Sequence, residues 1–161
     1  MKKKEFQFSF DIYNSIDELN LEDSLLLREA QKATEYSYAP YSKFKVGAVA
    51  KLSDGKIVSG SNQENASFPA GICAERVLLS SISSLHSNAH IETIAISYKN
   101  ENGKSNHPIS PCGICRQSLQ EYEQRMKHPI RLILGGIEGE IYILPKAAIL
   151  LPLAFTSDEL K

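Results

Sequence analysis

The chain has 161 residues, of which 42% are hydrophobic and 23% are charged. This length suits about one domain with a hydrophobic core, and the composition is ordinary for a globular protein. The formal net charge of −1 and the absence of Trp argue against recruitment of nucleic acid to a basic, aromatic surface. No stretch approaches the roughly 18 apolar residues of a membrane span. We therefore expect neither nucleic-acid nor membrane partners.

Two features of the chain bear on its compartment. Met1-Lys2-Lys3-Lys4 resembles the start of a signal peptide, but residues 5–11 alternate and contain two acids, so the apolar run of a secretory signal is missing. The three cysteines are an odd number and have the spacing of metal ligands, which indicates a reducing environment. We therefore expect a cytoplasmic protein.

The N-terminal residues carry the period of a β-strand. Phe6, Phe8, Phe10 and Ile12 alternate with polar residues, which predicts an extra edge strand over residues 5–13. The preceding lysines would discourage further pairing at that edge. The alternative is a disordered leader. We divide the chain into an N-terminal extension, residues 1–19, and a single domain, residues 20–161.

Downstream residues alternate between strand and helix patterns. Asn20 and Asp23 resemble a capping box, and the helix that they open must end before Pro40. Further strands are expected over residues 44–52, 56–61, 91–98, 130–134 and 140–144, and further helices over residues 73–85, 112–126 and 145–151. This order predicts an α/β fold with three α/β/α layers and a mixed sheet of about five to six strands.

All three cysteines lie in two short segments, residues 69–76 and 110–117. Each segment opens an expected helix at a Cys, where the positive end of the helix dipole favours a thiolate. Three soft ligands suit Zn²⁺, and three protein ligands rather than four leave a position for water, as in a catalytic site. Cys73, Cys112 and Cys115 are therefore candidate ligands of one zinc ion per chain.

Glu75 is placed to act beside this metal site. It lies two residues after Cys73, from where a carboxylate can move the protons of water. Cys73-Ala74-Glu75 and the later Pro111-Cys112-Gly113-Ile114-Cys115 match the signature of zinc-dependent deaminases. The alternatives are a disulfide, buried core thiols or a structural zinc knuckle. A knuckle would need a fourth ligand, and His107 is the histidine nearest to Cys112 in sequence.

With these residues, the chain resembles the cytidine deaminase family of the small, three-cysteine, homotetrameric kind. Four blocks within residues 35–155 carry the resemblance in the same order: Tyr38-Ala39-Pro40-Tyr41-Ser42-Lys43-Phe44-Lys45-Val46-Gly47-Ala48, Asn62-Gln63-Glu64-Asn65-Ala66-Ser67, the two helix starts, and Leu150-Leu151-Pro152-Leu153-Ala154-Phe155. The resemblance implies a small-molecule nucleoside substrate and a homo-oligomer, a tetramer. It implies hydrolytic deamination of cytidine and deoxycytidine to uridine and deoxyuridine with release of ammonia, in pyrimidine salvage.

The resemblance also assigns roles to residues. It implies that the three cysteines bind zinc and that Glu75 is the catalytic proton shuttle between water, N3 of the base and the leaving amine. The residues implied to contact the nucleoside within one chain are Phe44 at the base, Ala74 at the pyrimidine edge through its main chain, and Asn62 and Glu64 at the ribose hydroxyls. Ala66, through its main chain, and Phe155 would reach the site of a neighbouring subunit.

Charge suggests a role for Arg76. Three thiolates on one Zn²⁺ give a formal charge of −1, which makes the ion a poor acidifier of water. A guanidinium that donates hydrogen bonds to thiolate sulfur would withdraw part of that charge. We expect Arg76 to do this and Gln117 to be a similar donor. The chain departs from the family pattern at Phe68, where Tyr is usual, and at Leu153, where Gly is usual.

Three other functions fit parts of the pattern. A related deaminase of nucleoside antibiotics such as blasticidin S carries the same cysteine motifs, although the pair Asn62 and Glu64 favours an ordinary ribose. A nucleic-acid base deaminase would need a basic groove, which the net charge of −1 disfavours. A non-catalytic, zinc-stabilised interaction module would fold around zinc without any need for Glu75.

Overall fold

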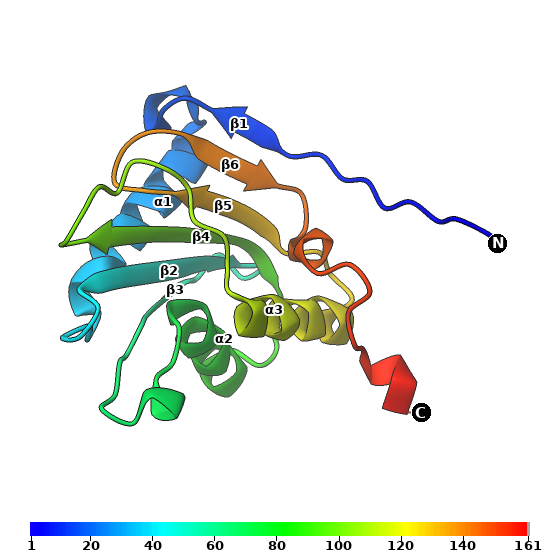
Figure 1. Cartoon of the computed structure of the whole chain (residues 1–161). Helices are drawn as coiled ribbons and strands as arrows, with labels where there is room; N and C mark the ends of the chain where they lie inside the picture. Colours follow the sequence, from blue (N-terminus) through cyan, green and yellow to red (C-terminus); the bar gives the residue numbers. More distant parts are fainter. Residues whose placement is uncertain (161) are drawn as a thin grey trace.

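The computed structural model describes residues 1–160 (Figure 1). Three helices of more than one turn are present in this part of the chain: α1 (Leu21–Ala33), α2 (Ala74–Leu85) and α3 (Gly113–Met126). The strands are β1 (Asp11–Tyr13), β2 (Phe44–Leu52), β3 (Ile57–Ser61), β4 (Ile91–Asn100), β5 (Arg131–Gly135) and β6 (Ile141–Leu144). Short 3₁₀ turns are η1 (Ile16–Glu18), η2 (Thr34–Tyr36), η3 (Phe68–Ala70), η4 (Ala147–Leu150) and η5 (Ser157–Leu160).

The strands form one mixed sheet in the order β1-β6-β5-β4-β2-β3. Only β4 and β5 pair in parallel, and every other neighbouring pair is antiparallel. A parallel pair needs a long crossover connection, and α3 lies in the segment that connects β4 to β5. The mixed sheet that the sequence predicts is confirmed.

Helices cover both faces of the sheet, as the predicted three-layer arrangement requires (Figure 1). On one face, Leu27 and Ala30 of α1 pack against the sheet in a cluster that includes Ala95. On the other face, α2 and α3 pack in a cluster that includes Ile94 and Ile96. Because Ile94 and Ile96 point to one helical layer and Ala95 to the other, β4 is buried on both sides. This explains why its sequence does not alternate.

The start of α1 is fixed to the sheet. The Asn20 side chain caps the helix by accepting from the Asp23 amide at 2.9 Å. Asp23 is buried, and its two carboxylate oxygens accept from the Arg131 guanidinium on β5 at 2.6 and 2.7 Å. A bidentate pair of this kind holds both side chains in one geometry. The N-terminus of α1 is therefore joined to the middle of the sheet.

Gly60 on β3 permits the close approach of α2. A Cβ at this position would lie 2.6 Å from the Leu78 amide nitrogen and 2.7 Å from the Ala74 carbonyl oxygen. Any side chain there would push α2 away from the sheet. The absence of a side chain at Gly60 thus sets the position of the helix that begins after Cys73.

The N-terminal strand is shorter than predicted. Residues 1–10 have no helix or strand, and β1 pairs with β6 only from Asp11, opposite Ile143, to Tyr13, opposite Ile141. The prediction of a strand over residues 5–10 is therefore wrong for the single chain. β6 ends at Leu144, and Pro145 has no N–H with which to extend the ladder of hydrogen bonds. Within the described residues, those before Asp11 therefore have no strand to pair with. The expected helix at 145–151 is the single turn η4.

Across residues 1–160, none of the helices combines the length and the apolar character that crossing a membrane requires.

Candidate metal centre and active site

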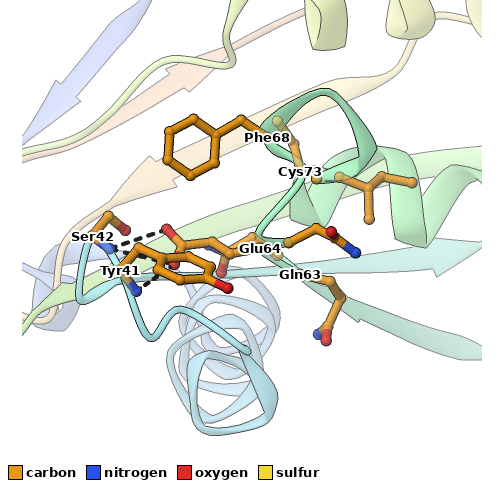
Figure 2. A pocket seen from close by; sticks show the side chains of 10 residues that line it. Tyr41, Ser42, Gln63, Glu64, Phe68 and Cys73 are labelled. Atoms are coloured by element: carbon orange, nitrogen blue, oxygen red, sulfur yellow. Dashed lines mark hydrogen bonds between the residues drawn. The ribbon is translucent and has the colours of Figure 1, made fainter.

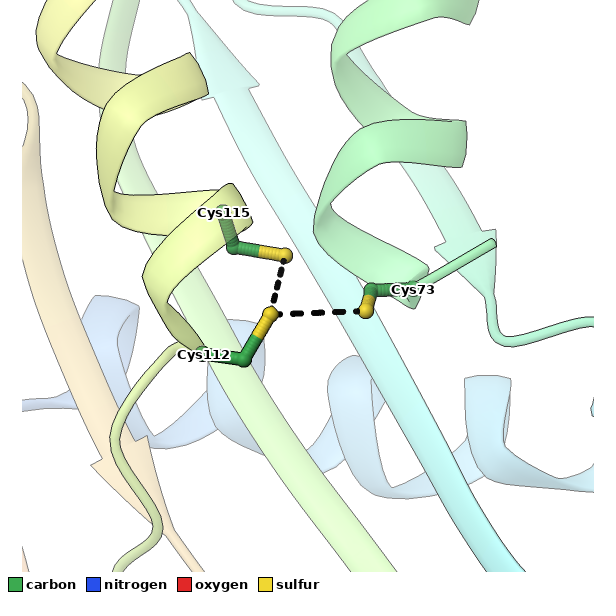
Figure 3. Close-up of side chains that lie close together, drawn as sticks. All are labelled: Cys73, Cys112 and Cys115. Atoms are coloured by element: carbon green, nitrogen blue, oxygen red, sulfur yellow. Dashed lines mark hydrogen bonds between the residues drawn. The ribbon is translucent and has the colours of Figure 1, made fainter. Parts of the chain in front are cut away.

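The three cysteines converge where two helices begin. Cys73 is the N-cap of α2, Cys112 is the N-cap of α3, and Cys115 lies in the first turn of α3. The Cys112 sulfur is 3.6 Å from that of Cys73 and 3.5 Å from that of Cys115, and Figure 3 shows all three pointing into one space. All three thiols are free, at separations far above the roughly 2.05 Å of a disulfide.

The sulfur arrangement fits a tetrahedral metal ion. Zn–S bonds of about 2.3 Å at tetrahedral angles place neighbouring sulfurs roughly 3.8 Å apart, close to the separations observed here. Among the described residues, the cluster holds only these three ligand atoms, all within 4.8 Å of one another. His107 is not a member, because its Nδ1 lies 3.1 Å from the Tyr98 hydroxyl instead. The cysteines can thus supply three ligands and leave a fourth position free.

The cysteine cluster favours a thiolate even without an ion. A hydrogen bond from the Cys115 thiol is the main reason why the pKa of Cys73 is lowered to about 6. The same hydrogen bond and burial raise the pKa of Cys115, so the proton stays there. Binding of a divalent cation would remove the remaining protons, because a coordinating thiol is deprotonated outright.

Glu75 brings a buried carboxyl group to the same place. It lies in the first turn of α2 and is only 5% exposed. Burial raises the pKa of Glu75, and a contact with the Cys115 thiol offsets part of that rise. A buried carboxyl group with a perturbed pKa beside a metal site has the properties of a catalytic acid or base.

Arg76 and Gln117, which were expected to donate hydrogen bonds to the cysteine sulfurs, do not contact them in this way. Arg76 is half-buried, and within residues 1–160 no hydrogen bond joins it to a cysteine sulfur, although its charge contributes to the low pKa of Cys73. Gln117 Nε2 donates to the Phe155 carbonyl at 2.9 Å and so binds the C-terminal segment to α3. The Arg116 guanidinium also donates hydrogen bonds, to the Leu150 carbonyl at 3.1 Å and to the Pro111 carbonyl at 2.8 Å.

A cavity of about 530 Å³ opens beside the first ligand. Its walls come from the loop before β2, the loop after β3 and the start of α2: Tyr41, Ser42, Asn62, Gln63, Glu64, Asn65, Phe68, Gly71, Ile72 and Cys73. Figure 2 shows Glu64 facing the backbone of Tyr41 and Ser42. This volume suits a small organic molecule.

Two of the expected ribose contacts, Asn62 and Glu64, line this cavity. Glu64 accepts from the Tyr41 amide at 2.8 Å and from the Ser42 amide at 3.3 Å. Hydrogen bonding to Ser42 is the main reason why the pKa of Glu64 is lowered, so the group is an anion. Asn62 Oδ1 accepts from the Val46 amide at 2.8 Å, and its Nδ2 donates to the Phe44 carbonyl at 2.9 Å.

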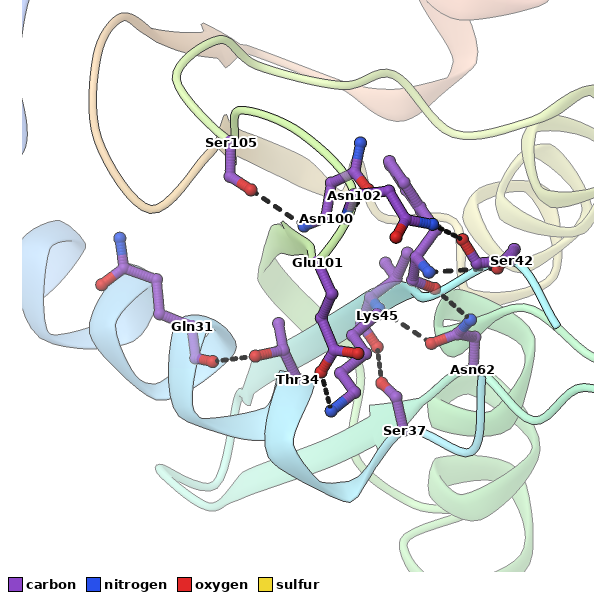
Figure 4. A network of polar contacts seen from close by, with 12 residues as sticks. Gln31, Thr34, Ser37, Ser42, Lys45, Asn62, Asn100, Glu101, Asn102 and Ser105 are labelled. Atoms are coloured by element: carbon purple, nitrogen blue, oxygen red, sulfur yellow. Dashed lines mark hydrogen bonds and ion pairs between the residues drawn. The ribbon is translucent and has the colours of Figure 1, made fainter. Parts of the chain in front are cut away.

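A polar network supports the loop beneath this cavity (Figure 4). Asn102 Nδ2 donates to the Ser42 carbonyl at 3.3 Å, and Lys45 pairs with Glu101 at 2.5 Å. Lys43, between them, adopts a left-handed φ of 59°. Contacts from the turn that follows β4 therefore hold the loop in the shape that presents its amides to Glu64.

The remaining expected contacts are more dispersed. Phe44 does not line the cavity and stacks on Tyr98 instead, with ring centroids 5.0 Å apart. Ala74 is fully buried at the start of α2. Ala66 lies in the exposed segment 65–70, and Phe155 is 59% exposed. Within one chain, the structure therefore brings together the cysteines, Glu75, Asn62 and Glu64, but not Ala66 or Phe155.

Sequence reasoning did not assign the aromatic residues at the mouth of the cavity. Tyr41 and Phe68 both line it, and their rings meet at a centroid distance of 6.1 Å. Tyr41 lies within residues 38–48, one of the segments that resemble the family, and this position could have indicated that it lies near the site. Ile72 also lines the cavity, and its position next to the candidate ligand Cys73 could have indicated this.

Known proteins share this sequence and fold. The sequence profile of the cytidine and deoxycytidylate deaminase zinc-binding region matches residues 21–128. A cytidine deaminase of Halalkalibacterium halodurans is 34% identical over 140 residues, which cover 87% of this chain and 98% of that protein. One from Mycobacterium tuberculosis is 36% identical over 111 residues, covering 67% of this chain and 79% of that protein.

A solved structure extends the likeness to three dimensions. The crystal structure of cytidine deaminase from Burkholderia pseudomallei superposes with a TM-score of 0.70 at 35% sequence identity, covering 85% of this chain and 100% of that one. The profile match includes all three cysteines and Glu75. On this evidence the chain belongs to the cytidine and deoxycytidylate deaminase family.

Proposed function

We propose that this protein deaminates cytidine and deoxycytidine hydrolytically, giving uridine and deoxyuridine with release of ammonia, as an enzyme of pyrimidine salvage. The observation that carries the proposal is the buried Glu75 carboxyl group beside three converging cysteine sulfurs, one of which, that of Cys73, belongs to a residue lining a cavity of about 530 Å³. The names of relatives that align over most of the chain support the same reaction.

The cysteine cluster is the proposed site of one zinc ion per chain. Cys73, Cys112 and Cys115 would hold it, since their sulfur separations fit tetrahedral geometry. When bound, zinc supplies the Lewis acidity that lets water act as a nucleophile near neutral pH. The positive helix ends of α2 and α3 lie at Cys73 and Cys112 and stabilise the thiolates.

Glu75 is the proposed proton carrier. Its carboxylate would take a proton from the attacking water and deliver it to N3 of the base. It would then take the proton of the new hydroxyl group at C4 and give it to the leaving amine, so that the C4–N bond breaks as the C4 carbonyl forms. Burial raises the pKa of Glu75, which brings the group closer to the pH at which it must both accept and release a proton. Cytidine and water thereby become uridine and ammonia, with atoms and charge balanced.

Substrate contacts follow from the cavity. Asn62 and Glu64 line its wall and are the proposed partners of the ribose hydroxyls, with the Glu64 anion as acceptor. The Ala74 main chain would meet the pyrimidine edge, and Phe44, stacked on Tyr98, would limit the base pocket. Arg76 is proposed to moderate the thiolate charge electrostatically, since its influence reaches Cys73.

The proposed working form is a homotetramer in the cytoplasm. Ala66 and Phe155 both lie in exposed segments, which suits residues that complete a neighbour's site. Gln117 would position Phe155 through its carbonyl rather than act on a cysteine sulfur. We propose no nucleic-acid partner, in keeping with the net charge of −1.

The test is ultraviolet absorbance of the protein with cytidine, with zinc measured on the same sample. The expected result is the cytidine-to-uridine change with about one zinc per chain. Glu75→Gln should keep the zinc and lose turnover by a factor of about 10² or more. Zinc without turnover on cytidine or deoxycytidine, but with turnover on blasticidin S, would assign the antibiotic substrate. Zinc with no turnover on any of these would leave a structural module.

A further inference from the structure

Residues 5–10, which we call the arm, have the sequence of a strand but pair with no strand among residues 1–160. Phe6, Phe8 and Phe10 lie on one side, with successive ring centroids 6.2 Å apart, and Phe10 continues this row onto Tyr142 of β6 at 4.9 Å. The arm extends away from the body in line with β1 (Figure 1). Its three rings and Ile12 are between 38% and 58% exposed.

The outer edge of β1 is also unpaired, because β1 is the last strand of the sheet. An unpaired edge beside a strand-forming segment is a template for pairing with another chain. The arm cannot fold back onto its own β6, which ends before Pro145. We propose that residues 5–13 pair antiparallel with the same residues of a second copy of this chain.

Among the two-fold registers, only one pairs all four apolar residues of this segment with one another. With the two-fold axis at Ser9, position 5 lies opposite position 13 of the second copy, and position 7 opposite position 11. Every aromatic residue of the arm then meets an apolar residue on the same face: Phe6 opposite Ile12, and Phe8 opposite Phe10. A two-fold axis at Phe8 would place Lys4 opposite Ile12, and an axis at Phe10 would place Asn14 opposite Phe6. A register shifted by one position would place Phe8 opposite Ser9 or Asp11.

Charge supports the same register. Residues 1–4 would continue past the pairing strands toward residues 14–17 of the second copy, which places Lys2, Lys3 and Lys4 beside the turn η1 with Asp17 and Glu18. The Asp17 side chain is 85% exposed and lies 3.7 Å from the Arg28 guanidinium, and the Glu18 carboxylate accepts from the Asn14 amide at 2.7 Å. A two-fold pair also closes on itself, since it uses the β1 edge of both copies and leaves neither β1 edge open for a third chain.

Ser9→Cys tests the axis directly. Opposed residues in an antiparallel pair have Cα atoms about 4.5–5.5 Å apart, within the range of a disulfide. Under mild oxidation of the zinc-loaded full chain, S9C should form a covalent dimer on a non-reducing gel. Gln7→Cys is the matched control, because Gln7 faces Asp11 and lies four positions from the Gln7 of the other copy. The unaltered chain controls for the three native cysteines.

The double variant S9C with Phe8→Glu provides the second test. It places a charge opposite Phe10 in an exposed segment, so folding is retained, and it should abolish the S9C crosslink. Crosslinking of Q7C as readily as S9C would mean random collisions of mobile arms and would overturn the proposal. So would an S9C chain that stays uncrosslinked, or one that crosslinks equally well with F8E. Deamination by each variant shows separately whether the proposed function holds.

Discussion

Glu123 of α3 is a buried carboxylate that joins three parts of the chain. Its Oε1 accepts from the Ile130 amide, just before β5, and from the Ala147 amide at the start of η4, both at 2.8 Å. Its Oε2 accepts from the Ala148 amide at 3.1 Å. Only 9% of the residue is exposed, so water cannot replace these bonds if the carboxylate is removed.

We predict that Glu123→Gln and Glu123→Ala destabilise the protein by different amounts. A hydrogen bond to a charged group contributes about 1.5–3 kcal/mol net. The Gln oxygen can keep both bonds of Oε1, but its NH₂ group would face the Ala148 N–H, so we expect a loss of about 2 kcal/mol. Ala leaves two buried amides and one half-buried amide without an acceptor, and we expect a loss of about 4 kcal/mol or more.

Urea unfolding at one fixed chain and zinc concentration measures both losses, because ligand binding and assembly also shift apparent stability. Glu121→Gln is the matched control: Glu121 is exposed on the same helix, so its loss should stay within about 0.5 kcal/mol. The reasoning is refuted if Glu123→Ala is no more costly than this control. If Glu123→Gln and Glu123→Ala lower the free energy of unfolding equally, Oε1 does not hold two of the three hydrogen bonds.

Three further outcomes are expected. Leu153 has a left-handed φ of 58° and is fully exposed, so Leu153→Gly should raise the free energy of unfolding by up to about 1 kcal/mol in urea, whereas Leu153→Ala should not. Gly60→Ala should lower the free energy of unfolding by about 1–3 kcal/mol, because the added Cβ would displace the start of α2. The same displacement should weaken zinc retention in a chelator titration. Removal of metal with a chelator should make Cys73 and Cys112 reactive toward a thiol reagent, whereas the buried Cys115 should stay slow, and both should react more slowly in zinc-loaded protein; equal rates for Cys73 and Cys112 with and without zinc would contradict the ligand assignment.

Local sequence patterns predicted most of the fold. The strand over residues 44–52 matches β2 at both ends, because apolar residues from Phe44 continue to a turn that Gly55 terminates. The helix starts at Cys73 and Cys112 are also confirmed, as N-caps of α2 and α3. Such signals lie within a few residues of the feature that they predict, so they can be read without knowledge of the tertiary structure.

Long-range partners were not predictable in this way. Asp23 and Arg131 are separated by 108 positions, and nothing in either neighbourhood indicates the other. The prediction for residues 5–10 failed for the same reason: their period is that of a strand, but pairing depends on where β6 ends. Gln117 was assigned to the cysteines from its motif, whereas its hydrogen bond goes to the distant Phe155 carbonyl.

The cysteine cluster joins segments that are far apart in the chain. Cys73 and Cys112 are separated by 39 positions, a span that contains α2 and β4. An ion held by both would act as a crosslink and restrict the unfolded chain, much as a disulfide closing a loop of that length contributes about 4 kcal/mol. Oxidation of these thiols to sulfinic or sulfonic acids, rather than to a disulfide, would therefore remove the metal ligands and this crosslink in one event. The protein would then lose activity and resistance to proteolysis together.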